Sequence, residues 1–135
     1  MSLRDKVGIH FEPFTFEIEK GKIKEFAMAI GDANPCYQAG EALPPTFATV
    51  IEMWGGTDFI ELAEKLELEL PKVLHGEQEY EYLGKIKVGE RVTGVTSVTN
   101  AISKENMDLI KLETHYKNEA GELVLISRNT VIERH

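Results

Sequence analysis

The segments with a strand pattern are gathered at the C-terminal end of this chain, after the segments with a helix pattern. From Val73 onward, short connectors separate four strand-like segments: "VLHGEQEYEYL", "ERVTGVTSVTNAI", "MDLIKLETHYK" and "ELVLISRNTVIE". Strands that follow helices, instead of alternating with them, indicate an antiparallel sheet with helices on one face. This order predicts an α+β fold and excludes a doubly wound parallel sheet.

Two shorter segments stand near the N-terminus. "FTFEIE" places Phe14, Phe16 and Ile18 on one face, which is the alternation of a half-buried strand. In "KGKIKEFAMAIGD", apolar residues recur at helical spacing, so we expect a short amphipathic helix. Gly31 stands where a left-handed residue would end that helix.

Residues 46–66, "TFATVIEMWGGTDFIELAEKL", carry an almost unbroken apolar stripe and predict the central helix. Gly55 and Gly56 interrupt it, and each costs a helix interior about 1 kcal/mol. We therefore expect a kink or a break at the two glycines. Thr46 is a plausible N-cap, and Thr57 is equally suited to start a second helix.

An antiparallel sheet around one long apolar helix is the hot-dog arrangement, and the order of the segments agrees with it. The length of 135 residues suits a single domain over residues 1–135. A small sheet of this type leaves an unpaired edge, and a two-fold axis commonly pairs such edges. We therefore expect a homodimer or a heterodimer.

Charge and composition exclude several classes of partner. Acidic residues outnumber basic ones by 23 to 15, and no Lys/Arg cluster marks a nucleic-acid surface. No apolar run approaches the roughly 20 residues that span a bilayer, and the N-terminus lacks a secretory signal. A single cysteine, Cys36, fits a reducing cytoplasm. Metal-ligand spacings such as H-x-x-H and C-x-x-C are absent, so we expect no metal or other cofactor.

A compact polar cluster, "GDANPCY", follows the first predicted helix. Asp32 has two interpretations there. It is either a turn-forming residue that bonds its own backbone, or part of an active site.

The chain resembles the MaoC-like hydratase/dehydratase family, and most closely its N-terminal dehydratase-type domain. The resemblance rests on "FTFEIEKGKIKEFAMAIGDANPCY", "PPTF", "VLHGEQEYEYLGKIKVGERV" and "LVLISRNTVIER", and it extends over nearly the whole chain. It implies a hot-dog fold and R-specific addition or removal of water on an acyl thioester of coenzyme A or acyl carrier protein.

Catalytic members of that family carry Gly-Asp-x-Asn-Pro-x-His after the first helix, and the Asp and His together hold and activate the water. Four residues match this motif: Gly31, Asp32, Asn34 and Pro35. Tyr37 stands where the histidine is expected. A tyrosine, with a reference pKa near 10, is a poor general base at neutral pH, whereas a histidine titrates near 6.5.

The resemblance therefore leaves alternatives. Tyr37 favours a subunit that acts with a histidine-bearing MaoC-like partner, because the family includes heterodimers in which one subunit alone keeps the pair. The second alternative is a self-sufficient homodimer that uses Asp32, Asn34 and a non-standard second group. The third is a hot-dog acyl-thioesterase with an acid on the central helix, although Glu52 and Asp58 suit a solvent-facing or dimer-interface position better.

Two further features are candidates for the site. His75 is either a replacement base or an ordinary strand histidine. The resemblance also implies that backbone N–H groups at the start of the central helix, near Pro45, Thr46 and Phe47, polarise the thioester carbonyl. Alternatively, "PPT" is simply a favourable helix start.

Overall fold

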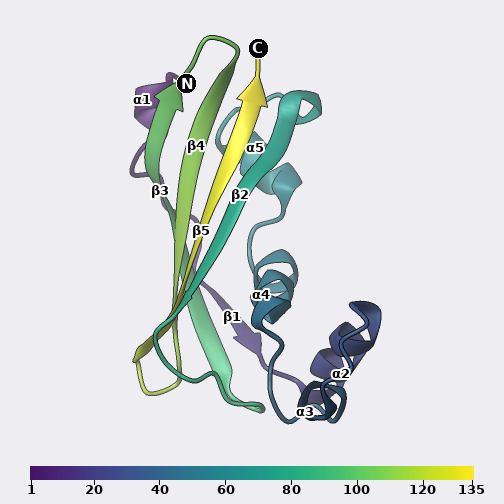
Figure 1. The fold of residues 1–135 in the computed structure, drawn as a ribbon. Helices are drawn as coiled ribbons and strands as arrows, with labels where there is room; N and C mark the ends of the chain where they lie inside the picture. Colours follow the sequence, from purple (N-terminus) through teal and green to yellow (C-terminus); the bar gives the residue numbers. More distant parts are fainter.

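A five-stranded sheet is the framework of this protein (Figure 1), whose computed structural model describes residues 1–135. The strands are β1 (Phe14–Glu17), β2 (Val73–Tyr82), β3 (Arg91–Ser103), β4 (Met107–Lys117) and β5 (Leu123–Arg134). Their order in space is β1-β3-β4-β5-β2, and every neighbouring pair is antiparallel. The antiparallel sheet predicted from the order of the segments is confirmed.

The helical elements are short. They are α1 (Leu3–Lys6), α2 (Lys20–Ala29), α3 (Pro35–Gln38), the 3₁₀ turn η1 (Pro45–Phe47), α4 (Ala48–Gly55), α5 (Phe59–Lys65) and the 3₁₀ turn η2 (Leu70–Lys72). In Figure 1, α4 and α5 follow one another along one side of the sheet, and α2 and α3 lie beyond α4. None of these helices has the length and apolar character that a membrane crossing requires.

The predicted central helix is two helices, as the paired glycines indicated. Helix α4 ends at Gly55, and α5 begins after Asp58, whose Oδ1 accepts a hydrogen bond of 2.9 Å from the Glu61 N–H. The residue that caps α5 is therefore Asp58 and not Thr57. The prediction of Thr46 as an N-cap is also wrong, because Thr46 lies inside the η1 turn that precedes α4.

The end of α2 has the geometry predicted from Gly31. This glycine has a φ of +69°, in the left-handed region that favours glycine. Its N–H donates to the Met28 carbonyl at 3.2 Å, and the Asp32 N–H donates to the Ala27 carbonyl at 3.0 Å. The two bonds form a Schellman motif, which turns the chain sharply into the polar cluster.

The apolar core is divided into two clusters along the sheet. The cluster that includes α4 contains Ile18, Ile23, Phe47, Ala48, Ile51, Ile86, Val92, Tyr116, Val124 and Leu125. The cluster that includes α5 contains Phe11, Leu62, Ala63, Leu66, Leu68, Val98, Ile110, Leu112 and Val131. The division of the core therefore accompanies the break between the two helices.

Helices α4 and α5 also carry apolar side chains that the chain itself leaves exposed. Trp54 is 76% exposed, Ile60 58% and Met53 48%. The Lys22 ammonium lies 5.8 Å from the centroid of the Trp54 ring and shields it only in part. The two helices therefore present apolar side chains to solvent as well as to the sheet.

Candidate active site: a cavity beneath the broken helix

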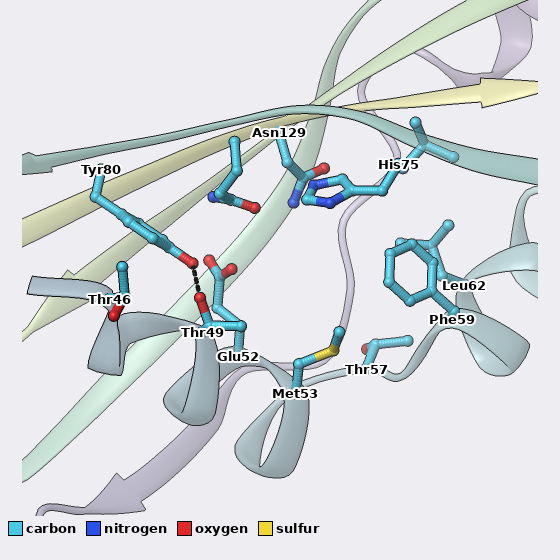
Figure 2. A pocket seen from close by; sticks show the side chains of 12 residues that line it. Thr46, Thr49, Glu52, Met53, Thr57, Phe59, Leu62, His75, Tyr80 and Asn129 are labelled. Atoms are coloured by element: carbon cyan, nitrogen blue, oxygen red, sulfur yellow. Dashed lines mark hydrogen bonds between the residues drawn. The ribbon is translucent and has the colours of Figure 1, made fainter. Parts of the chain in front are cut away.

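A cavity of about 450 Å³ opens between the helix layer and the sheet (Figure 2). Its lining comes from η1, α4, the α4–α5 connection, α5, β2 and β5: Thr46, Thr49, Glu52, Met53, Thr57, Phe59, Leu62, His75, Gln78, Tyr80, Asn129 and Val131. This volume falls within the range of about 300–1,000 Å³ that is usual for small-molecule sites. The cavity is therefore the candidate site of this chain.

The strand β5 explains why the cavity wall is polar in the middle. Leu125 belongs to the first core cluster and Val131 to the second, and both have register partners that face the helices. Strand side chains alternate between faces, so Ser127 and Asn129 lie on the same face between them. Ser127 is only 1% exposed. A polar stretch thus separates the two apolar clusters at the level of the cavity.

The strand β2 contributes the other half of this wall. Tyr80 is paired with Ser127, and Gln78 with Asn129. Gln78 Nε2 donates to Ser127 Oγ at 2.8 Å, which satisfies a buried hydroxyl. The two strands therefore present Gln78, Tyr80 and Asn129 to the cavity, and the buried Ser127 lies on the same face of the sheet.

His75 lies in the cavity because β2 is irregular. The register of β2 shifts between His75 and Glu77, so His75 pairs with Val131 and its side chain joins the inner face. A Cβ atom at the intervening Gly76 would come within 2.6 Å of Ile132 Cδ1, which explains the glycine. The His75 ring then packs edge-on against Phe59, with centroids 6.0 Å apart.

Glu52 points inward from α4, so the expectation of a solvent-facing or dimer-interface position is wrong. It stands one helical turn after the buried Ala48, on the same face of α4. Figure 2 shows its carboxyl group directed toward the strands, on the side of Tyr80 and Asn129. The spacing to Ala48 was the signal that sequence reasoning missed.

Burial dominates the electrostatics of Glu52. Its Oε1 atom is buried and makes no hydrogen bond of normal geometry. Burial raises the pKa of the Glu52 carboxyl, and the nearby hydroxyls of Ser127 and Tyr116 offset this only in part. The cavity therefore contains an acid that is held toward its neutral form.

Two tyrosines connect β2 to the start of the helix layer. The Tyr80 hydroxyl and Thr49 Oγ1 are 2.5 Å apart and share a hydrogen bond, and the Tyr82 hydroxyl donates to the Pro45 carbonyl. Burial raises the pKa of each tyrosine to about 12. The negative charge of Glu52 makes a smaller contribution in the same direction. Both phenols therefore stay protonated and act as hydrogen-bond donors or acceptors, not as bases.

The predicted catalytic residues Asp32 and Asn34 lie outside this lining, at the start of α3. Asp32 Oδ1 accepts a hydrogen bond of 2.9 Å from the Asn34 N–H, and Asn34 Oδ1 caps α3 through the Cys36 N–H at 3.0 Å. Gln38 Nε2 donates to the Asp32 carbonyl at 3.1 Å. These bonds provide the turn-forming role considered for Asp32, and a catalytic role stays a prediction.

Tyr37 connects the polar cluster to the η1 side of the cavity. It is half-buried on α3 and lies close enough to Tyr82 to contribute to the raised pKa of that tyrosine. Tyr82 in turn holds Pro45, next to Thr46 in the cavity lining. The structure therefore brings Tyr37 and the start of η1 into one region.

The three predicted substrate-binding residues differ in position. Thr46 lines the cavity, whereas Pro45 has no N–H and its carbonyl accepts from Tyr82. Phe47 is fully buried, and its N–H donates to the Pro44 carbonyl at 2.9 Å. Thr46 is thus the one of the three that faces the cavity. No group of three or more His, Cys, Asp or Glu side chains is placed to hold a metal ion.

An antiparallel sheet that packs against a central helical segment over a cavity defines the class of hot-dog proteins, and the MaoC-like dehydratases share this fold. The HadBC (3R-hydroxyacyl-ACP dehydratase) complex from Mycobacterium tuberculosis has a chain that superposes with a TM-score of 0.78 at 18% identity, covering 95% of this chain and 97% of that one. The ChsH1–ChsH2 complex of the same organism gives a TM-score of 0.72 at 17% identity, covering 92% and 83%.

The chain belongs to the family described as "FAS1-like, dehydratase domain region", whose profile matches residues 5–127. It is also similar to the UPF0336 protein of Thermobifida fusca. The two are 34% identical over 142 residues, which cover 97% of this chain and 93% of the relative. The family resemblance stated from the motifs is confirmed.

Proposed function

We propose that this chain is one subunit of a cytoplasmic R-specific enoyl-thioester hydratase or 3-hydroxyacyl-thioester dehydratase, and that a MaoC-like partner supplies the catalytic histidine. The observation that carries the proposal is Tyr37, which stands at the histidine position of the family motif. A phenol is a poor general base at neutral pH, so this chain lacks one half of the water-activating pair.

Several features support association with a partner. The fold neighbours HadBC and ChsH1–ChsH2 are both complexes, and the first is a dehydratase by name. Strand β2 is an edge of the sheet, and an unpaired edge is readily covered by another chain. The exposed Trp54 and Ile60 add apolar surface that a partner would remove from water. A homodimer or a heterodimer with a MaoC-like subunit is consistent with all three.

In this proposal, the thioester lies near Thr46 and the acyl chain extends into the cavity. Asp32 and Asn34 shape the loop beside the entrance, where the partner's catalytic pair would meet the substrate. His75 is not used as a base, because it stands at the end of the cavity opposite Thr46 (Figure 2).

The test is hydration of crotonyl-CoA by this chain, by a MaoC-like protein with an intact Gly-Asp-x-Asn-Pro-x-His motif encoded beside it, and by their mixture. General acid–base assistance is typically worth about 10²–10⁴-fold, so we expect the mixture to exceed this chain alone by that order. In the mixture, Asp32→Asn in this chain should change the rate little. Robust hydration by this chain alone, lost in Asp32→Asn, would instead favour the self-sufficient homodimer.

A thioesterase is the second candidate, because the Glu52 carboxyl faces the cavity. A carboxylate near a thioester can activate water for hydrolysis. Release of free CoA thiol from acyl-CoA, abolished in Glu52→Gln, would support this candidate over the hydratase. Hydration without thiol release would exclude it.

A further inference from the structure

Resting on the proposed function, we propose that a second cavity of this chain binds the phosphopantetheine arm of the acyl carrier, and that Lys85 and Lys87 hold the phosphate of that arm. This cavity, which we call the arm cavity, has a volume of about 440 Å³. It lies between the loop that precedes η1 and the segment that follows β2. CoA and acyl carrier protein carry the same arm, so the inference concerns the chemistry that the two carriers share.

The first argument is that the arm cavity continues the walls of the cavity beneath the broken helix. Along β2, Tyr80 lines the first cavity and Tyr82, on the same face, lines the arm cavity. On the opposite wall, Thr46 lines the first cavity and Leu43, three residues earlier, lines the arm cavity. The hydrogen bond from the Tyr82 hydroxyl to the Pro45 carbonyl joins the two walls between the cavities. A thioester at Thr46 with its acyl chain in the first cavity would therefore extend its arm into the second.

The second argument is that the arm cavity is positively charged in a chain that is acidic as a whole. Lys85 and Lys87 line it and are exposed, and neither forms an ion pair with an acidic side chain. Glu41 is the one acid in the lining, so two lysines and one glutamate leave a net charge of +1. The nearby Glu90 carboxylate accepts from the Lys87 N–H at 2.9 Å. The two free ammonium groups suit an anion such as a phosphate.

The third argument concerns the backbone of the segment that carries the lysines. Ile86 is buried in the first core cluster and Val88 packs against that cluster, whereas Lys85 and Lys87 are exposed. This alternation is typical of an extended segment and places the two lysines on one side of it. The N–H groups of Lys85, Ile86 and Val88 donate to no backbone carbonyl of this chain. Free N–H groups of an extended segment pair readily with the amides of an extended ligand, and pantetheine contains two amides.

The fourth argument is that the arm cavity also has an apolar part. Leu43, Ile86 and Val88 are among its lining residues. A free phosphate would leave this apolar surface in contact with water, whereas the methylene and methyl groups of pantetheine would cover it. The cavity therefore matches a ligand that is partly apolar along its length and anionic at its end.

The experiment measures binding of butyryl thioesters by titration calorimetry, because a saturated chain cannot be hydrated during the titration. The four carriers are pantetheine, 4′-phosphopantetheine, CoA and acyl carrier protein. They are titrated into the full chain alone and into its mixture with the MaoC-like partner. The variants are Lys85→Gln/Lys87→Gln, which removes both charges, and Lys85→Arg/Lys87→Arg, which keeps them. The charge-matched control is Arg4→Gln/Lys104→Gln, at exposed positions on α1 and in the β3–β4 turn, at the other end of the sheet (Figure 1).

We expect the phosphopantetheine thioester to bind about 2- to 25-fold more tightly than the pantetheine thioester, since each exposed charge pair is worth about 1.4- to 5-fold in affinity. The ratio should fall to about one in Lys85→Gln/Lys87→Gln, and the arginine variant and the control should keep it. A wild-type ratio of one, or a ratio that survives in the glutamine variant, would overturn the inference. Either result, together with hydration of crotonyl-CoA by the mixture, would leave the proposed function intact.

The two natural carriers locate the recognised group. Loss of affinity for both butyryl-CoA and butyryl-acyl carrier protein in the glutamine variant would support recognition of the shared phosphate. Loss for CoA alone would overturn the inference in favour of contacts to the nucleotide, and loss for the carrier protein alone would overturn it in favour of contacts to the acidic protein surface. If no butyryl thioester binds and the mixture does not hydrate crotonyl-CoA, the proposed function fails, and the inference fails with it. Absence of binding with intact hydration would overturn the inference alone.

Discussion

Replacement of Glu52 is the most informative perturbation of stability in this protein. The wild-type side chain places a carboxyl with an unpaired oxygen beneath α4, where burial raises its pKa above the ordinary value of 4.5. An apolar side chain of similar size removes the buried acceptor without opening a large cavity. We therefore predict that Glu52→Leu stabilises the protein at neutral pH.

The magnitude follows from the unpaired atom. Removal of one unsatisfied buried polar group is worth about 1–3 kcal/mol. For 135 residues, an unfolding entropy of about 2.1 cal/mol/K per residue gives roughly 0.28 kcal/mol/K in total. The expected gain in Tm is thus roughly 4–11 °C. Glu64→Gln, at an exposed acid, should stay within about 0.5 kcal/mol of the wild type.

The pH dependence identifies ionisation as the cause. Because the folded-state pKa of Glu52 is raised, the folded chain binds more protons than the unfolded chain between about pH 4.5 and the folded pKa. The stability contributed by the protonated carboxyl is complete below that window and is lost as pH rises through it. The advantage of Glu52→Gln over the wild type should therefore grow from about pH 4.5 upward and then level off.

Scanning calorimetry of the wild type and the three variants between pH 4 and 8 measures both effects. A lower Tm for Glu52→Leu at neutral pH would refute the reasoning that the carboxyl destabilises the fold. A difference between Glu52→Gln and the wild type that does not change with pH would show that ionisation is not responsible.

Two further predictions concern local packing and capping. A Cβ atom at Gly94 would lie 2.6 Å from Phe14 Cζ and 2.8 Å from Tyr116 Cε1. Gly94→Ala should therefore lower the free energy of unfolding, measured in urea, by about 1–3 kcal/mol. An unchanged urea midpoint would contradict this close packing. Asn34→Ala removes the side-chain cap that accepts from the Cys36 N–H, so it should lower the free energy of unfolding by about 0.5–2 kcal/mol. Asn34→Asp should keep the cap and therefore the stability. Equal melting temperatures of the two variants would exclude a stabilising cap.

Local signals in the sequence were sufficient for the elements. The left-handed residue at Gly31 and the helix break after Gly55 were both predicted. Few residues other than glycine favour a left-handed backbone, and glycine disfavours the interior of a helix. The order of the segments also predicted the antiparallel sheet. The caps were predicted less well: Asp58, not Thr57, starts α5, since several residue types serve equally as caps.

The cavity was not predictable in the same way, because its residues meet only through the register of distant strands. His75 faces the cavity owing to the irregularity at Gly76, and a one-residue shift moves every side chain to the other face. Asn129 lies in a segment whose pattern indicated only a strand. Glu52 had a local signal in its spacing to Ala48, but its unpaired oxygen depends on the sheet opposite.

The divided core connects these observations. A continuous apolar stripe from Leu125 to Val131 would join the two clusters, yet Ser127 and Asn129 stand between them, and α4 and α5 separate above them. Buried polar groups that destabilise a fold are expected where a site requires them, since selection retains them for function.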